Sequence, residues 1–541
     1  MKVEVLDKLR GVVRDTLSKH LYRSAIFFAD KVSFLTNDPA DIYMQAQALF
    51  LDRQYRRALH LLNASKIVLL DPRFRYLAAK CLEELKEWDQ CLLMLGEAKI
   101  DDQGNFFDTQ DCNAMYLDKD AQDCEINISS AICLLRGRAY EALENRVQAR
   151  LWYIAAIKAD PLCYEALECL KEKYMLTCEE EASLLSELKF GSDDDWLKSF
   201  YSCMINMHEK EDALEASFKE IEEKFCVEDS CNLSSEHALK TNADLMACKA
   251  EYLQQRAEYY KCFELTSTLL EKDPFHMKCT LLHLVAAMEL ENSNELYLMA
   301  CNLVKDYPQK AISWFAVGCY YFCIKKYSQS RHYFSKATTI DATFAPAWIG
   351  YGNAYAAQDE GDHAMLAYRT AARFFPGCHL PTLYIGMEYK RTHSYKLAEQ
   401  FLLQAKSMCP FDPLVDNELG VVAYNMKEYE KAIICFEKAL SQIPRLDKLW
   451  EPTVVNLAHA YRKLKFYSKA ISFYEKALTL SRNHNTYGGL AYTYHLQDDL
   501  KNAITYYHKA LWMKPEDQFC SQMLNLAIID ESNKLNYLQD V

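Results

Sequence analysis

The sequence has no uninterrupted apolar stretch of the roughly 18 residues that a membrane-spanning helix requires, so we expect no membrane span. Acidic residues interrupt the first seven positions, where a secretion signal needs an apolar run, so we expect no signal peptide. Glycine is also scarce: the chain has 14 in 541 residues, well below the usual share of roughly 7%. Because glycine weakens helix interiors, this scarcity suits a chain that is almost entirely helical.

The motifs that mark catalytic and cofactor sites are missing too. There is no phosphate-binding loop, no dinucleotide-binding glycine pattern, no His-Glu-x-x-His and no Gly-x-Ser-x-Gly. The 21 cysteines show no regular spacing and no Cys-x-x-Cys pair, which indicates neither a disulfide framework nor a zinc site. We therefore predict a protein that is not an enzyme and that has no catalytic, cofactor-binding or metal-binding residues.

The net charge and the length of the chain exclude further classes of protein. A net charge of −14 argues against a nucleic-acid partner, since binding to phosphates requires an excess of basic side chains. A chain of 541 residues is too long for one globular core, because such cores stop growing near roughly 250–300 residues. A stacked array of repeats avoids that limit, since each unit contacts only its neighbours.

A 34-residue period is the main positive signal. Three series share it: Gly318, Gly352, Gly386 and Gly420; Ala337, Ala371, Ala405 and Ala439; and Pro274, Pro308, Pro376, Pro410 and Pro444. This period and composition are typical of the tetratricopeptide helix–turn–helix unit. The small residues let the two helices of a pair approach closely, and aromatic side chains such as Phe334, Tyr368 and Phe436 fill the space around the contact. The proline ends the second helix because it has no amide hydrogen to donate.

Counting from these positions places the repeats. Units are expected to begin near 243, 277, 311, 345, 379, 413, 451 and 484. In the N-terminal half, a clear unit is expected at about 130–163 and looser ones near 6, 39 and 72. Cys91 and Cys262 occupy alanine positions of the repeat and should be small buried side chains. The fold is predicted to be an all-α superhelical solenoid of about 13–14 tetratricopeptide repeats.

The predicted organisation has five parts. Residues 1–99 form N-terminal repeats, 100–127 an acidic loop and 128–242 further repeats that are partly degenerate, interrupted by a polar segment at 191–195. Residues 243–515 form the C-terminal superhelix, and 516–541 a capping helix and tail.

The first helix of each repeat should line the concave side of the superhelix. Positions 2, 5, 9, 12 and 13 of that helix point inward, since they lie on the stripe that is not used for pairing. The predicted peptide-groove residues are Ile312, Phe315, Cys319, Phe322, Ile349, Asn353, Leu383, Met387, Asn417, Val421, Tyr424, Asn425, Val455, His459 and Tyr492. An apolar and aromatic row with a few amides suits an extended peptide, because asparagine pairs with both backbone C=O and N–H. Packing against superhelical neighbours is the simpler interpretation of any single one of them.

Several segments are more distinctive than a generic repeat. They include Ser-Trp-Phe-Ala-Val-Gly-Cys-Tyr-Tyr at 313–321, Leu-Tyr-Ile-Gly-Met-Glu-Tyr at 383–389 and Lys-Leu-Trp-Glu-Pro at 448–452. In the N-terminal half, Tyr-Arg-Ser-Ala-Ile-Phe-Phe-Ala-Asp-Lys-Val at 22–32 belongs to the same pattern. Together they resemble the cell-division-cycle-sixteen family of tetratricopeptide subunits of the anaphase-promoting complex (cyclosome), across nearly the whole chain and most specifically over 243–515.

The resemblance implies a non-catalytic scaffold in a RING-type ubiquitin ligase that supports degradation of mitotic regulators. Members of the family form homodimers through the N-terminal repeats, here within about 1–160, including 1–99. Their C-terminal groove, here about 243–515, holds the N-terminal segment of a small accessory subunit of the cell-division-cycle-twenty-six type, and other faces stack on sister tetratricopeptide subunits. Nucleus and cytoplasm, with spindle and centrosome in mitosis, are the expected locations.

Three other interpretations remain open on the sequence. A co-chaperone adaptor would clamp the C-terminal carboxylate of a heat-shock protein with paired Lys and Asn, but those positions hold Val421 with Asn425 and His459 with Lys463. A glycosyltransferase regulatory half would need a catalytic domain, and little chain follows residue 515. The third alternative is a sister tetratricopeptide subunit of the same complex.

Overall fold

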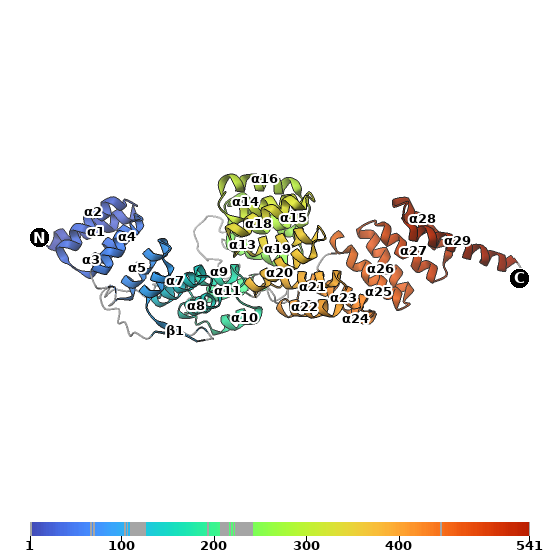
Figure 1. Cartoon of the computed structure of the whole chain (residues 1–541), viewed down its shortest axis with the longest axis horizontal. Helices are drawn as coiled ribbons and strands as arrows, with labels where there is room; N and C mark the ends of the chain where they lie inside the picture. Colours follow the sequence, from blue (N-terminus) through green and yellow to red (C-terminus); the bar gives the residue numbers. More distant parts are fainter. Residues whose placement is uncertain are drawn as a thin grey trace, which may run out of the picture. The chain divides into compact units, whose positions relative to one another are not determined.

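The structure is a computed structural model of the chain. It describes residues 3–64, 68, 71–101, 104, 106–108, 126–191, 194–205, 216, 218–219, 221, 242–443 and 446–539. Most of the predicted acidic loop and the later part of the predicted degenerate repeats lie outside these residues. The described chain consists of antiparallel helices (Figure 1) and divides into two compact units, residues 1–198 and 199–541.

Unit 1 is a row of helix pairs. Its helices are α1 (Val3–Ser18), α2 (Tyr22–Thr36), α3 (Pro39–Leu51), α4 (Tyr55–Ala64), α5 (Pro72–Glu84), α6 (Trp88–Leu95), α7 (Ile128–Ala142), α8 (Arg146–Ala159), α9 (Tyr164–Glu172) and α10 (Cys178–Glu187); α11 (Asp195–Ile205) runs across the boundary to unit 2. Helices α3 and α5 begin alike, with an aspartate cap followed by proline. The carboxylate of Asp38 accepts a hydrogen bond from the amide of Ala40 at 3.1 Å, and that of Asp71 accepts one from Arg73 at 2.8 Å.

A short hairpin interrupts unit 1, and the all-α prediction missed it. Strands β1 (Ala98–Ile100) and β2 (Phe106–Asp108) pair antiparallel. Strand β1 begins at the end of the predicted N-terminal repeats, and β2 lies inside the segment 100–127 that was interpreted as a loop. Three-residue strands are too short to show a period of two, so the alternation of side chains gave no signal. Gly104, between them, has a φ of +79°, and a Cβ there would lie 2.6 Å from a methyl carbon of Ile154 on α8. The hairpin turn therefore depends on glycine both for its conformation and for its contact with α8.

Unit 2 follows the predicted register closely. Its helices are α13 (Ala243–Gln255), α14 (Tyr259–Lys272), α15 (Met277–Glu289), α16 (Ser293–Asp306), α17 (Ala311–Cys323), α18 (Tyr327–Ile340), α19 (Ala345–Ala356), α20 (Gly361–Phe374), α21 (Leu380–Arg391), α22 (Tyr395–Met408), α23 (Pro413–Asn425), α24 (Tyr429–Ser441), α25 (Glu451–Lys463), α26 (Tyr467–Leu480), α27 (His484–Leu496), α28 (Leu500–Met513) and α29 (Gln518–Gln539). Each first helix begins within one residue of the predicted start. The tetratricopeptide solenoid is thus confirmed.

Glycine at the helix crossing has the predicted role. A Cβ added to Gly318 would lie 2.6 Å from the ring of Phe334, and one on Gly420 would lie 2.6 Å from the ring of Phe436. Real Cβ atoms do not approach other atoms this closely, so the second helix can pack at this distance only against glycine. Cys91 and Cys262 are fully buried, as predicted, and burial raises the pKa of each thiol to about 12.

The turn inside each helix pair has a backbone conformation that its residue types do not indicate. One residue per turn has a left-handed backbone without being glycine, for example Lys325 with φ 60° and Lys427 with φ 67°. In the first of these turns the amide of Lys326 donates to the carbonyl of Tyr321 at 2.9 Å, which closes the end of α17. These hydrogen bonds hold the residue in a conformation that costs roughly 1–2 kcal/mol outside glycine.

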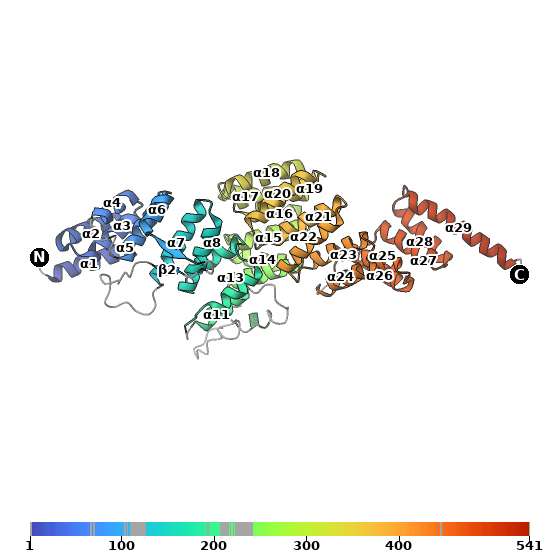
Figure 2. The same ribbon diagram turned by 60° about the horizontal axis from the view of Figure 1, so that its bottom comes forward.

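Unit 2 also curves back on itself. Arg256, at the end of α13, donates a hydrogen bond to the carbonyl oxygen of Gln442, at the end of α24, at 3.4 Å. The two residues are 186 positions apart, so the pairs between them form a closed turn of the superhelix (Figure 2). Beyond this turn, a 3-10 segment (Lys448–Trp450) precedes α25, and Trp450 is buried.

Candidate functional site

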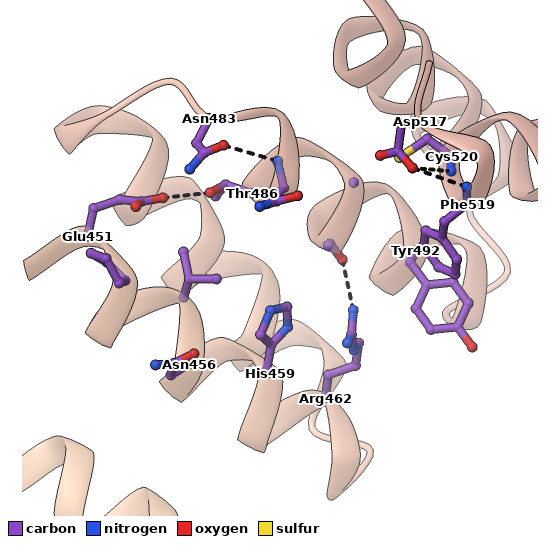
Figure 3. Close-up of a pocket in the computed structure, with 15 residues that line it drawn as sticks. Glu451, Asn456, His459, Arg462, Asn483, Thr486, Tyr492, Asp517, Phe519 and Cys520 are labelled. Atoms are coloured by element: carbon purple, nitrogen blue, oxygen red, sulfur yellow. Dashed lines mark hydrogen bonds between the residues drawn. The ribbon is translucent and has the colours of Figure 1, made fainter. Parts of the chain in front are cut away.

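A cavity of about 660 Å³ lies on the first helices of the last repeats, α25 and α27, and on the start of α29. Three predicted groove residues, Val455, His459 and Tyr492, line it (Figure 3). The complete lining comprises Glu451, Pro452, Val455, Asn456, His459, Arg462, Asn483, Asn485, Thr486, Gly488, Gly489, Tyr492, Asp517, Phe519 and Cys520. The cavity is therefore part of the predicted groove, at its C-terminal end.

One end of the cavity is formed by a buried hydrogen bond between two first helices. The hydroxyl of Thr486 donates to a carboxylate oxygen of Glu451 at 2.6 Å, and both side chains are buried. Glu451 is the first residue of α25, where the positive end of the helix dipole favours an anion. Asn483 caps α27 by accepting from the amide of Asn485 at 3.3 Å. These contacts fix the distance between the two helices.

His459 is a neutral, hydrogen-bonded side chain in the wall. Its Nδ1 shares a hydrogen bond with the phenol of Tyr474 on α26, and the two atoms are 2.5 Å apart. Burial, with smaller contributions from Arg462 and Lys463, lowers the pKa of His459 to about 3. An uncharged imidazole whose nitrogen is already paired does not supply the cation that a chaperone-type carboxylate clamp needs.

Arg462 carries the positive charge of the cavity. Its guanidinium donates to the carbonyl oxygen of Gly489 at 3.4 Å and lies 5.1 Å from the ring centre of Tyr492. The Tyr492 ring in turn meets Phe519 edge to face, with the centroids 5.7 Å apart. Arginine and aromatic side chains at a partly open surface are the groups that most often anchor a protein partner.

Asp517 closes the other end, at the start of α29. Its carboxylate accepts from the amides of Phe519 and Cys520 at 3.1 and 3.4 Å. Burial acts to raise the pKa of Asp517, but the hydrogen bonds from Cys520 and Phe519 outweigh it, and the pKa is lowered. The cavity thus presents fixed carboxylates at two ends and one guanidinium between them.

Two amide side chains in the lining are open to a ligand. Within the part of the chain that the structure describes, the side chains of Asn456 and Asn485 make no hydrogen bond, and both reach the cavity. An asparagine amide can donate to a backbone carbonyl and accept from a backbone N–H. The arrangement suits binding of an extended peptide.

The other predicted groove residues differ in burial. Ile312, Phe315, Cys319 and Leu383 are buried, whereas Asn425 is exposed and the remaining ones are partly exposed. Phe315 packs against Phe334 and Phe344, with ring centroids 5.5 Å apart in both cases. For these buried positions the structure shows a packing role, and the groove assignment of the other residues stays a prediction.

Two predicted amides already have partners. Asn353 accepts a hydrogen bond from the hydroxyl of Tyr368 at 2.6 Å, and Asn417 accepts one from Thr453 at 3.0 Å. Asn456 and Asn485, which have none, were not among the predicted residues. Asn485 is at position 2 of its helix, on the stripe, but was not chosen, whereas Asn456 lies just off the stripe. Asn456 is at position 6, so widening the stripe by one residue would have found it.

Other kinds of site are absent from the described residues. No helix among them is both long and apolar enough to cross a bilayer. Over the same residues, no three His, Cys, Asp or Glu side chains are grouped so that they could hold a metal ion.

The geometry defines a tetratricopeptide-repeat protein, and family models for this repeat match residues 417–446, 452–484 and 485–517. A further family model, "Anaphase-promoting complex, cyclosome, subunit 3", matches residues 18–98.

Relatives that match nearly the whole chain identify the family within this class of repeat proteins. The chain is 70% identical to anaphase-promoting complex subunit 6 of Arabidopsis thaliana, over 98% of both chains. It is 39% identical to the human cell division cycle protein 16 homolog, over 97% of this chain and 84% of the relative. Among solved structures, the crystal structure of the APC/C hetero-tetramer Cut9–Hcn1 matches with a TM-score of 0.81 and 34% identity, covering 96% of each chain. The chain belongs to the anaphase-promoting complex subunit 6 family, whose members include cell division cycle protein 16 and Cut9.

Proposed function

We propose that this chain is a non-catalytic scaffold subunit of the anaphase-promoting complex, a ubiquitin ligase, and that it supports degradation of mitotic regulators. One observation carries the proposal: the fold matches the Cut9–Hcn1 assembly over 96% of both chains, at a TM-score of 0.81. An open array of helix pairs supplies long surfaces for partners rather than an enclosed reaction centre. The proposed locations are the nucleus and cytoplasm, with spindle and centrosome in mitosis.

Homodimerisation through the N-terminal repeats is the second part of the proposal. Helix α2 and its cap expose large apolar side chains: Leu21, Phe27, Phe34 and Leu35 are 53%, 59%, 90% and 55% exposed. Phe27, Phe34 and Leu35 are spaced by seven and eight residues, so they share one face of the helix. Such a contiguous apolar surface is typical of a protein–protein contact. A hetero-tetramer of two named components, as in Cut9–Hcn1, must contain at least two copies of one of them.

The third part is that the C-terminal groove holds the N-terminal segment of a small accessory subunit. The cavity on α25, α27 and α29 offers the unpaired amides of Asn456 and Asn485, the Arg462 guanidinium and the Tyr492 ring. These groups match an extended peptide with backbone carbonyls and N–H groups to pair. Hcn1, the second component of the matched assembly, is the precedent for this occupant.

Purification of the tagged chain from dividing cells tests the proposal. We expect the other subunits of the complex, sister tetratricopeptide subunits included, to co-elute, and the eluate to attach ubiquitin to a mitotic regulator. Untagged cells and cells that express the tag alone serve as controls. Co-elution with a heat-shock chaperone, without the ligase subunits, would instead support the co-chaperone alternative.

The sister-subunit alternative rests on one observation, the match to the subunit 3 family. That match covers residues 18–98 only. A subunit 3 protein of Schizosaccharomyces pombe is 22% identical over 38% of this chain, whereas subunit 6 relatives match nearly all of it. The proposal therefore assigns the chain to the subunit 6 position in the complex.

A further inference from the structure

The repeats from residue 311 onward follow a pairing rule between a groove residue and a buried residue fifteen positions later, on the second helix of the same pair. Where the groove residue is apolar, the buried residue has no hydroxyl. Cys319 shares a core cluster with Phe334, Met387 packs on the cluster of Leu402, and Val421 packs on that of Phe436. In these repeats the pair is entirely apolar.

Where the groove residue is polar, the buried residue is tyrosine. The hydroxyl of Tyr368 donates to Asn353 at 2.6 Å, and that of Tyr474 shares a hydrogen bond with His459 at 2.5 Å. Both tyrosine side chains are almost completely buried. Each buried hydroxyl is thus paired with a side chain of the groove, as burial of a polar group requires.

Tyr507, in the last full repeat, breaks this rule. It is fully buried on α28, and within the described chain its hydroxyl oxygen has no hydrogen-bond partner. The groove residue fifteen positions earlier is Tyr492, whose ring turns to Phe519 and Arg462 instead. A buried hydroxyl without a partner destabilises the fold, and such a group in a native protein calls for an explanation.

The surroundings of this hydroxyl connect it to the cavity. Burial raises the pKa of Tyr507, and the side chains of Cys520, Tyr492 and Arg462 are close enough to affect it. All three of those residues line the cavity on α25, α27 and α29. Tyr507 therefore lies close to the part of the cavity wall that Tyr492 and Cys520 form, and Tyr492 packs against the core cluster that contains it.

We propose that the peptide bound in this cavity completes the pairing rule: one of its main-chain carbonyl oxygens accepts a hydrogen bond from the Tyr507 hydroxyl. This inference rests on the proposed function, because it assigns a contact to the peptide that the groove is proposed to hold. It makes Tyr507 a binding residue, although the free chain covers its side chain.

The Tyr492 side chain can be displaced at low cost. The Tyr492 ring is held by its contacts with Arg462 at 5.1 Å and Phe519 at 5.7 Å, and no hydrogen bond is found for its hydroxyl in the described structure. A peptide that takes over the contact with Arg462 can displace the ring and reach the hydroxyl behind it. Binding then gains a hydrogen bond that the free chain lacks, without breaking one that it has.

The test compares Tyr507→Phe with Tyr474→Phe in the full chain, using the Hcn1-type accessory subunit of the same organism as the probe. Tyr507→Phe removes an unpaired hydroxyl, so we expect the melting temperature of the free chain to stay the same or rise. Its affinity for the accessory subunit should fall about tenfold, since the new hydrogen bond is lost. Tyr474→Phe removes a hydroxyl that is already paired with His459, so it should lower the melting temperature of the free chain.

The possible results distinguish failure of the Tyr507 inference from failure of the proposed groove function. If the wild-type chain binds the accessory subunit and Tyr507→Phe binds it within twofold of wild type, the inference is wrong and the hydroxyl is satisfied by solvent. If Tyr507→Phe melts well below wild type, the hydroxyl has a structural partner and the inference fails as well. If the wild-type chain itself does not bind the accessory subunit, the proposed groove function fails, and the inference with it. A crystal structure of the complex with a peptide carbonyl within about 3 Å of the Tyr507 hydroxyl would establish the contact directly.

Discussion

The ring of Tyr368 occupies the space that a side chain at residue 352 would need. A Cβ on Gly352 would lie 2.3 Å from Cε1 of Tyr368, which is itself fully buried. The ring has little freedom to retreat, because its hydroxyl is bonded to Asn353 at 2.6 Å and its face stacks on Tyr384 at 5.2 Å. Gly352 and Tyr368 therefore pack as a single unit. Related pairs of a glycine and an aromatic residue recur along the solenoid.

Gly352→Ala should lower the free energy of unfolding by about 2 kcal/mol, since overpacking of a rigid contact outweighs the better helix propensity of alanine. Denaturant unfolding of the full chain measures the change. Gly11→Ala is the matched control: residue 11 is exposed on α1 and an added Cβ there meets nothing within 4 Å. The control should stabilise the protein by about 0.5–1 kcal/mol, as alanine does in a helix interior. Equal stability of Gly352→Ala and wild type would contradict the packing argument.

The left-handed turns allow a stabilising change. Lys325 is exposed and has φ 60°, so Lys325→Gly should raise the free energy of unfolding by about 0.5–1 kcal/mol, the relief of the left-handed cost less the added freedom of the unfolded chain. Gln400→Gly provides the comparison, because Gln400 is an exposed residue inside α22 with helical backbone. That control should lose about 1 kcal/mol. Thermal unfolding measures the stability of both variants. If Lys325→Gly is less stable than wild type, relief of strain in the turn is ruled out.

His459 should make the protein sensitive to acid. Its pKa is about 3 in the folded chain, against 6.5 for an unperturbed histidine, so below pH 6.5 the unfolded chain binds more protons than the folded chain. The stability that this group contributes is complete above pH 6.5 and is lost as the pH falls from 6.5 towards 3. At pH 5 the loss amounts to about 2 kcal/mol.

The pH dependence of the melting temperature checks this. His459→Gln keeps a hydrogen-bond partner for Tyr474 but does not titrate, so its melting temperature should fall less between about pH 7 and pH 5 than that of wild type. His20→Gln changes an exposed histidine and should follow the wild-type curve. Parallel curves for wild type and His459→Gln would show that the imidazole is not held neutral by burial.

The exposed face of α2 predicts a dimer contact. Phe34→Asp places a charge on a side chain that is 90% exposed, so it should leave folding nearly unchanged while it opposes association. Light scattering of the full chain at micromolar concentration should give a dimer for wild type and a monomer for the variant. Ile434→Asp, on α24 and 66% exposed, should remain dimeric. A Phe34→Asp variant that stays dimeric would place the interface elsewhere.

The groove assignment separates residues that bind from residues that pack. Asn456→Ala should reduce affinity for the accessory subunit about fivefold to tenfold at an unchanged melting temperature, because the amide has no partner in the described free chain. Phe315→Ala should act mainly on folding, with a loss of about 3–5 kcal/mol, since the ring is 3% exposed and packs between two other rings. Calorimetric titration and thermal unfolding together measure both effects. Normal affinity in Asn456→Ala would remove this residue from the peptide site.

The fold was largely predictable because the repeat is local. A helix pair of 34 residues is defined by small residues, aromatics and a proline at set spacings, and every first helix of unit 2 begins within one residue of its predicted start. The hairpin at 98–108 was not predictable in this way. Its strands have three residues each, and its turn is held by the contact of Gly104 with Ile154, about fifty residues further along.

The site was predictable only in part. Val455, His459 and Tyr492, which lie on the stripe of the first helix, line the cavity, and their role in peptide binding stays a prediction. Spacing along one helix could not show that Phe315 and Leu383 are covered, since the covering side chains come from neighbouring helices. Glu451 and Thr486 belong to the cavity through a contact between repeats, which has no period within one repeat.

From the sequence alone, one could derive the helical pair and its register, because these depend on contacts between residues a few turns apart in the chain. The tertiary structure alone decided which groove side chains remain available to a partner and which hydroxyl is left without an acceptor. The availability of each side chain depends on how successive helix pairs rotate and stack. It is therefore set by contacts between side chains that are not neighbours in the periodic sequence pattern.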